Sequence, residues 1–303
     1  MEILRTPDEC FANVPDFPYE PKYVDVPRGD DTGDLRVAYV EAGPSDGPLV
    51  LCMHGEPTWS FLYRTVIAEL VDAGCRVIAP DLVGFGRSDK PSEPTDHTYA
   101  RHVEWMRAAL FDALDLREVT LLGQDWGGLI GLRLVAENTD RFAKVVAANT
   151  GLPDGQHAMP EVWHMFRQAV ATAPTLDIGR FVMSGCRHAL AAEVVAAYDA
   201  PFPEERFKAG PRAMPQLVPI TPDDQGAIDN RKAWETLSRL EIPFLCAFSD
   251  GDPITAPMAA ILPTLIPGAA GREHPTIKDA GHFLQEDAGD QLGRVVAEFA
   301  LGG

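Results

Sequence analysis

The fold of this chain is decided by the stretch Val119-Thr120-Leu121-Leu122-Gly123-Gln124-Asp125-Trp126-Gly127-Gly128-Leu129-Ile130-Gly131. An apolar, β-branched run that leads at once into glycines and an apolar helical pattern predicts a buried strand turning sharply into a helix. Glycines flank Asp125 because so tight an elbow leaves little room for Cβ atoms, while it lifts the central side chain clear of the backbone. A carboxylate there is ionised at neutral pH. It can displace a leaving group from a saturated carbon and form an ester that water must then cleave.

Composition limits the partners of the protein. The 303 residues are 46% hydrophobic, so the chain can bury a large core. With 26 basic and 45 acidic residues the net charge is -19, which argues against nucleic acid and anionic membranes as partners and favours a neutral small substrate.

The same composition bears on the compartment. The five cysteines are scattered without a Cys-x-x-Cys pair, which is typical of reduced thiols in a cytoplasmic protein. Acidic residues and a proline among residues 1–8 argue against a signal peptide. Prolines interrupt the longest uncharged stretch, residues 254–271, so we expect no membrane span.

The order of elements predicts an α/β architecture. Alternating strands and helices before residue 150 indicate a mostly parallel, doubly wound sheet whose site lies at the carboxyl ends of its strands. The expected strands are 23–26, 35–42, 49–53, 76–79, 119–124 and 144–148, with a turn at 29–33 between the first two and helices at 59–73 and 99–115.

The pattern changes past Thr150. Residues 151–230 contain Gly/Pro breaks and short helical patterns without a good buried strand, as expected of a helical cap inserted between two strands. We therefore predict a core domain of residues 1–150 and 231–303 and a cap of residues 151–230. After the cap we expect a helix at 233–240, strands at 243–248 and 274–277, and a closing helix that ends at Leu301.

Two later loops supply candidates for an acid and a base. The strand 243–248 ends in Ser249-Asp250-Gly251-Asp252-Pro253, and the last strand leads to Asp279-Ala280-Gly281-His282-Phe283. With Asp125 upstream, the order nucleophile, acid, histidine is that of an α/β-hydrolase triad, which makes His282 the candidate base. Spacing alone does not choose between Asp250 and Asp252.

A third motif, His54-Gly55-Glu56-Pro57-Thr58-Trp59, follows the strand 49–53. In α/β-hydrolases a His-Gly at this place opens a loop that supplies half of an oxyanion hole. The resemblance implies backbone N–H donors from Glu56 and Trp126, while His54 is expected to be structural.

Together, the three motifs resemble those of the haloalkane dehalogenases, over roughly residues 23–299. The resemblance implies an α/β-hydrolase fold with a helical cap, and hydrolysis of a haloalkane to a primary alcohol, halide and a proton without metal or organic cofactor. It also implies Trp126 as one halide donor. Because Glu56 stands where some members have Asn, the second donor is expected from a cap tryptophan, Trp163. The family pattern matches the Asp before Pro253, which favours Asp252 as the acid, and the Glu56 side chain is expected to position water.

Two alternatives stay open. An epoxide hydrolase shares the Asp nucleophile but uses two lid tyrosines, whereas residues 151–230 hold one, Tyr198. A ligand-binding protein built on a hydrolase scaffold is the other. A cytoplasmic monomer is expected, with a neutral halogenated alkane and halide as its small-molecule partners. The sequence does not fix the preferred haloalkane.

Overall fold

The computed structural model describes residues 1–30 and 32–302, so Asp31, within the predicted turn, and Gly303, the end of the predicted core range, lie outside the described residues. Among these residues seven strands form the central sheet: β2 (Lys22–Pro27), β3 (Asp34–Ala42), β4 (Leu49–Met53), β5 (Arg76–Pro80), β7 (Val119–Gln124), β8 (Phe142–Ala148) and β9 (Phe244–Cys246).

The sheet has the order β2-β3-β5-β4-β7-β8-β9. The pairs β2/β3 and β3/β5 are antiparallel, and the other four neighbouring pairs are parallel. All residues of β4 and β7 are buried, as apolar strands covered on both faces must be. The predicted mostly parallel sheet is confirmed.

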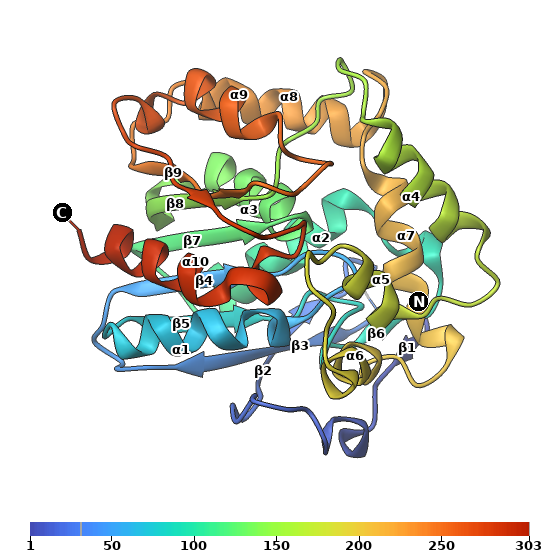
Figure 1. Ribbon diagram of the computed structural model, residues 1–303. Coiled ribbons are helices and arrows are strands. Elements are labelled where there is room, and N and C mark those ends of the chain that lie inside the picture. Colours follow the sequence, from blue (N-terminus) through green and yellow to red (C-terminus); the bar gives the residue numbers. More distant parts are fainter. Residues whose placement is uncertain (31, 303) are drawn as a thin grey trace.

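Helices cover both faces of this sheet (Figure 1). On one face α1 packs against α10, and on the other α3 packs against α2 and α8. The amphipathic patterns of these segments place their apolar sides on the sheet. Their bounds are α1 (Arg64–Asp72), α2 (Tyr99–Arg107), α3 (Trp126–Glu137), α8 (Gln225–Leu237), α9 (Met258–Leu265) and α10 (Leu284–Leu301).

Several predicted boundaries were wrong. The helix expected from residue 99 to 115 ends as α2 at Arg107 and continues as a π-helical turn, residues 108–113. The helix expected at residue 233 begins at Gln225, because the carboxylate of Asp224 accepts the N–H groups of Ile220 and Thr221 and closes the turn before it. Its polar first half, with a glycine and an asparagine, gives no apolar period to detect.

The strand expected at residues 243–248 is also divided. It forms β9 and then β10 (Phe248–Ser249), with Ala247 between them. The predicted last strand is shortened to β11 (Thr276–Ile277), which pairs in parallel with β10 in a separate two-stranded sheet. The break turns the chain after β10 away from the central sheet, and a hydrogen-bonding pattern of this kind leaves no mark on apolar periodicity.

Residues 151–230, the inserted segment, contain helices where the parallel strands end (Figure 1). No strand occurs in this segment, all of which lies within the described residues. Glu286 of α10 ties it to the core, since its carboxylate pairs with Arg64 of α1 and accepts the hydroxyl of Tyr198. Its helices are α4 (Glu161–Thr172), α5 (Ile178–Ser184), α6 (Ala192–Asp199) and α7 (Ala209–Leu217).

The N-terminal arm, residues 1–22, lies on both parts. Its strand β1 (Ile3–Leu4) pairs with β6 (Lys90–Pro91) of the core, and the Thr6 hydroxyl donates to Pro201 O of the inserted segment at 2.6 Å. Among the described helices, none combines the length and apolar character needed to cross a membrane.

Candidate active site

Asp125 lies at the elbow between β7 and α3, with φ 50° and ψ −127°. This conformation is unfavourable for a residue with a side chain, so the surroundings must hold it. Asp125 N–H donates to Asn149 O at 3.1 Å, and the Thr150 hydroxyl donates to Asp125 O at 2.8 Å. A Cβ at Gly127 would lie 1.9 Å from Met53 O, which explains the glycine after the elbow. The result is a carboxylate fixed clear of its backbone.

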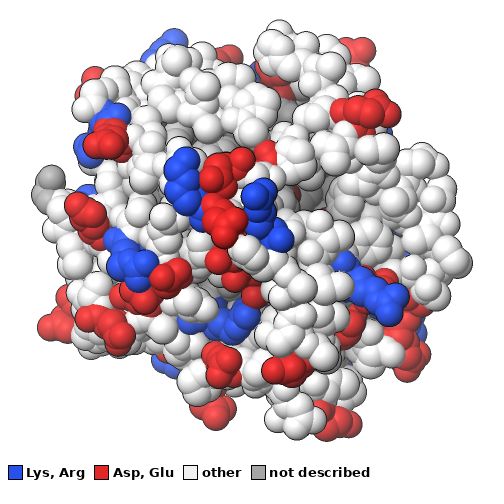
Figure 2. Space-filling view, viewed as in Figure 1, with Lys and Arg blue, Asp and Glu red and all other residues white. Residues whose placement is uncertain are grey.

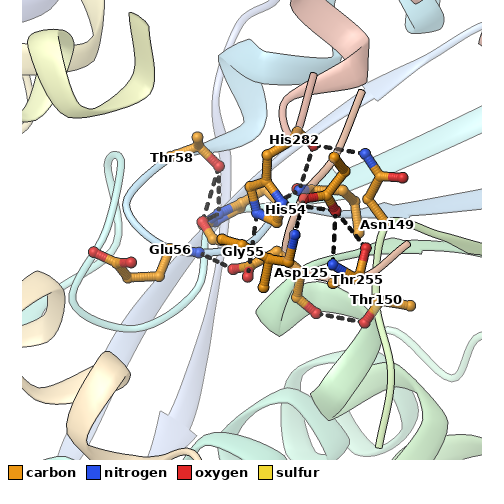
Figure 3. A network of polar contacts seen from close by, with 12 residues as sticks. His54, Gly55, Glu56, Thr58, Asp125, Asn149, Thr150, Thr255 and His282 are labelled. Atoms are coloured by element: carbon orange, nitrogen blue, oxygen red, sulfur yellow. Dashed lines mark hydrogen bonds and ion pairs between the residues drawn. The ribbon is translucent and has the colours of Figure 1, made fainter. Parts of the chain in front are cut away.

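The Asp125 carboxylate has one contact on each oxygen (Figure 3). Its Oδ1 accepts the backbone N–H of Glu56 at 2.8 Å, and its Oδ2 lies 3.5 Å from His282 Nε2. The carboxylate is 23% exposed and lines a cavity. It is therefore held from two sides and remains accessible to a small molecule.

The side chain of Glu56 points away from Asp125 (Figure 3). Burial, and then the negative charge of Asp125, raise the pKa of the Glu56 carboxyl well above its usual value, which favours its neutral form. It lines the same cavity as Asp125. Its predicted contact with water stays a prediction.

His282 contacts Asp252 rather than Asp250. His282 Nδ1 lies 3.1 Å from Asp252 Oδ2, whereas Asp250 is exposed and lies 3.9 Å from Lys278 Nζ. Asp252 is oriented by the N–H of Ile254 at 2.9 Å and by the Thr255 hydroxyl. Burial works against the ionised Asp252, but His282 and these donors lower its pKa to about 2.

The charge of His282 depends on two carboxylates. Burial lowers the pKa of the imidazole, while Asp252 and Asp125 raise it, with a net value of about 10. His282 is therefore protonated near neutral pH as long as both carboxylates are ionised.

His54 has a structural place in this region, as expected. Its Nε2 accepts the N–H of Leu82 at 2.9 Å, and its Nδ1 lies 2.9 Å from Gly55 O. Burial lowers the pKa of His54, which keeps the ring neutral. The ring fixes the loop that carries Glu56.

A cavity of about 1200 Å³ opens above Asp125, and Glu56, Trp126, Trp163 and His282 also line it. Three of the five tryptophans of the chain, Trp59, Trp105 and Trp234, donate their indole N–H to backbone carbonyls. Within residues 1–30 and 32–302, Trp126 and Trp163 make no such bond, although only 3% and 5% of their surfaces are exposed. Two tryptophans whose indole N–H has no protein acceptor among these residues thus line the cavity.

Comparisons with known proteins show the family of this chain. The model of the protein family described as alpha/beta hydrolase fold matches residues 48–289 of this chain. A haloalkane dehalogenase of Psychrobacter cryohalolentis is 51% identical over 299 residues, which is 99% of this chain and 98% of the relative. Haloalkane dehalogenase 1 of Mycobacterium tuberculosis is 51% identical over 96% of each chain.

The chain belongs to the haloalkane dehalogenase family.

A solved structure agrees with this membership. The haloalkane dehalogenase of Paraglaciecola agarilytica, described as tetrameric, superposes with a TM-score of 0.89 at 36% identity and covers 100% of this chain and 99% of its own.

In this member of the haloalkane dehalogenase family, two amides that the sequence did not single out hold the His282 loop. Asn149 Nδ2 donates to the carbonyls of Gly281 and His282, both at 3.0 Å, and Gln124 Nε2 lies 3.3 Å from His282 Nε2. Both residues directly follow or end a predicted strand, at the sheet edge where a parallel sheet carries its site. That position was the available signal. The partners, more than 130 residues away, could not be inferred from it.

Proposed function

We propose that the protein hydrolyses haloalkanes to a primary alcohol, a halide ion and a proton, with Asp125 as nucleophile, His282 as base and Asp252 as its partner. One observation carries the proposal: a partly buried carboxylate on a strained elbow, which lines a cavity, lies 3.5 Å from a histidine that is itself 3.1 Å from a buried carboxylate.

In the first step, an Asp125 oxygen attacks the carbon that carries the halogen, and the carbon–halogen bond breaks as the ester bond forms. The bonding electrons leave with the halide. The indole N–H groups of Trp126 and Trp163, which have no protein acceptor among the described residues, are suited to receive that anion. Hydrogen bonds to a charged acceptor contribute on the order of 1.5–3 kcal/mol each. They also act locally against the field of a chain whose net charge is -19, which disfavours an anion at the reacting centre.

Alkylation prepares the second step. An esterified Asp125 is neutral, so one of the two carboxylates that raise the pKa of His282 no longer does so. His282 then loses its proton to solvent and accepts one from the water that attacks the ester carbonyl. The bond from that carbon to the alkyl oxygen then breaks, the alcohol leaves with the proton held by His282, and the new Asp125 carboxyl group returns its own proton to the histidine. The backbone N–H of Glu56, whose nitrogen lies 2.8 Å from Asp125 Oδ1, would bind the developing oxyanion. We assign the second donor to the backbone N–H of Trp126, which is distinct from its indole N–H.

The remaining assignments belong to the same proposal. We propose that residues 151–230 form the cap and that Trp163 of α4 is the halide donor from this cap. Together with Glu56 after His-Gly, this assigns the chain to the subgroup whose second halide donor is a cap tryptophan. We also propose a cytoplasmic location. For the oligomeric state we propose a monomer, although the Paraglaciecola relative is described as tetrameric. Light scattering on the purified protein would decide between these states.

An epoxide hydrolase fits less well. Ring opening in those enzymes uses two lid tyrosines, whereas the single tyrosine of the inserted segment, Tyr198, is fully buried and donates to Glu286.

The test measures halide release from 1,2-dibromoethane and 1-bromobutane by the wild type and by Asp125→Ala. We expect one alcohol per halide from the wild type and no halide from the variant. Diol formation from styrene oxide, without halide from either bromide, would overturn the proposal in favour of the epoxide hydrolase. Circular dichroism of Asp125→Ala confirms that it is folded.

A further inference from the structure

The cavity is larger than a short haloalkane requires. Its volume of about 1200 Å³ exceeds the roughly 300–1,000 Å³ typical of sites for drug-sized ligands. A water molecule accounts for about 30 Å³ of liquid, and a methylene group is of similar size. A four-carbon substrate held at Asp125 would therefore leave most of the cavity to solvent.

Apolar side chains continue from the cavity to its outer edge. Ile261 and Leu265 of α9 line the cavity and are nevertheless 39% and 45% exposed, so they form an apolar rim. In the part of the chain that the structure describes, they are two of four large hydrophobic residues that are exposed. Figure 2 shows a surface over α9 that is largely free of charged side chains, and α9 itself contains none. A patch of this kind at the edge of a binding site indicates an apolar ligand.

The cavity lining also offers little positive charge to an acidic tail. Two arginines line it within the described residues, and both are engaged. Arg231 donates to Asp154 O at 3.0 Å and Pro222 O at 2.9 Å, and Arg187 pairs with Asp279 at 3.2 Å. With acidic Asp154 and Glu235 also in the lining and a net charge of -19, a carboxylate at the far end of a substrate would be repelled.

We propose that the preferred substrates are terminal haloalkanes with a long, unbranched and uncharged tail of about eight carbons or more, which lies against Ile261 and Leu265 of α9. This inference rests on the proposed function. Each methylene transferred from water to an apolar wall can increase kcat/KM by up to about fourfold, until the tail passes the rim.

The experiment compares kcat/KM for bromide release from 1-bromobutane, 1-bromohexane, 1-bromooctane and 1-bromodecane, all below their solubility limits. We expect kcat/KM to rise through 1-bromooctane, and 10-bromodecanoate to be a poorer substrate than 1-bromodecane. If kcat/KM is flat or falls beyond six carbons while 1-bromobutane is hydrolysed, the inference is overturned and the proposed function stands. Bromide release from none of the four overturns both. Faster hydrolysis of 10-bromodecanoate than of 1-bromodecane overturns the inference that the tail is uncharged.

Variants at the rim test where the tail lies. Leu265→Ser and Ile261→Ser should lower kcat/KM for 1-bromodecane about threefold to tenfold and leave 1-bromobutane within about twofold. The matched control is Leu301→Ser, which removes an equally exposed apolar side chain, 50% exposed, outside the cavity lining. It should change neither substrate. Equal losses on both bromides in the rim variants, or an unchanged value for 1-bromodecane, would overturn the placement on α9.

Discussion

One wall of the cavity carries Asp125 and His282, with Asp252 buried behind it, and comes from strand ends and their loops, whereas a second wall comes from helices α4 and α9. The first wall is rich in buried polar groups, and Asp125, Asp252 and His282 all have protein partners. The second presents apolar surface and an indole. The difference follows from geometry: strand ends bring backbone donors and short loops together, while a helix offers a face of side chains.

The histidines show the same division. His54, His97, His102 and His282 are buried in the core, whereas His157, His164 and His188 of the inserted segment are all exposed. On the cavity itself, the first wall holds the charged groups Asp125 and His282, while the second is mainly apolar. Changes to the two walls should therefore affect different steps of the reaction.

The largest effect is expected at the first wall. His282→Phe should release one halide per enzyme and then stop, because ester formation needs no base while hydrolysis loses a contribution of about 10²–10⁴-fold. Mass spectrometry should find the alkyl group on Asp125. His164→Phe, at an exposed histidine of α4, should turn over normally. Continued turnover by His282→Phe would show that His282 is not the base.

The second wall should act on the halide. Trp163→Phe removes an indole donor and should slow halide release about 10–100-fold, with weaker inhibition by added halide. The control is Trp234→Phe, because Trp234 lines the same cavity but its indole N–H already donates to Leu152 O at 2.9 Å. Similar changes in halide inhibition for both variants would assign Trp163 to packing alone.

Acid should destabilise the protein through two buried histidines of the core that lie outside the cavity lining. Burial lowers the pKa of His97 to about 4 and that of His102 well below its usual value. The unfolded chain takes up protons below about pH 6.5 and the folded one does not. The free energy of unfolding should therefore fall between pH 6.5 and 4 by about 1.4 kcal/mol per pH unit for each such histidine.

His282 contributes in another window, because its pKa is raised to about 10 and its stabilisation is lost only as the pH rises toward that value. Urea unfolding at pH 7.5, 6.0 and 5.0 measures the slope. His102→Gln should reduce it, and His164→Gln, at an exposed position of the second wall, should not. An equal slope in all three proteins would exclude His102 as its source.

The smallest effect is expected where the two walls meet. The Asp287 carboxylate accepts the N–H groups of Arg187 at 2.7 Å and His188 at 2.9 Å from the inserted segment, and that of Gly281 at 2.9 Å beside His282. Asp287→Asn replaces one acceptor oxygen by a donor and should slow ester hydrolysis about threefold to tenfold, with the halide burst unchanged.

Asp290→Asn is the matched control for this change. Asp290 lies on the same helix and pairs with the exposed Arg294 at 2.8 Å. Rapid-mixing measurements separate the burst from the steady state. Equal losses in both phases of Asp287→Asn would indicate general destabilisation instead of a displaced His282.

The sequence predicted the features that local patterns determine. The elbow at Asp125, the strands on either side of it and the order of nucleophile, acid and histidine follow from apolar runs and glycine positions. The break between β9 and β10, the early start of α8 and the choice of Asp252 over Asp250 depend on hydrogen bonds. Asn149 and Asp287 gave no motif, since their partners lie elsewhere in the chain or in another element.

One short hydrogen bond has a consequence for chimeric enzymes. The backbone N–H of His282 donates to Gly185 O of the inserted segment at 2.7 Å. A Cβ on Gly281 would lie 2.5 Å from the same oxygen. The position of His282, the proposed base, is thus set partly by the inserted segment. A graft that replaces all of residues 151–230 by the corresponding segment of another family member is expected to displace His282. A graft that keeps residues 184–188 could replace α4 and leave the position of His282 unchanged.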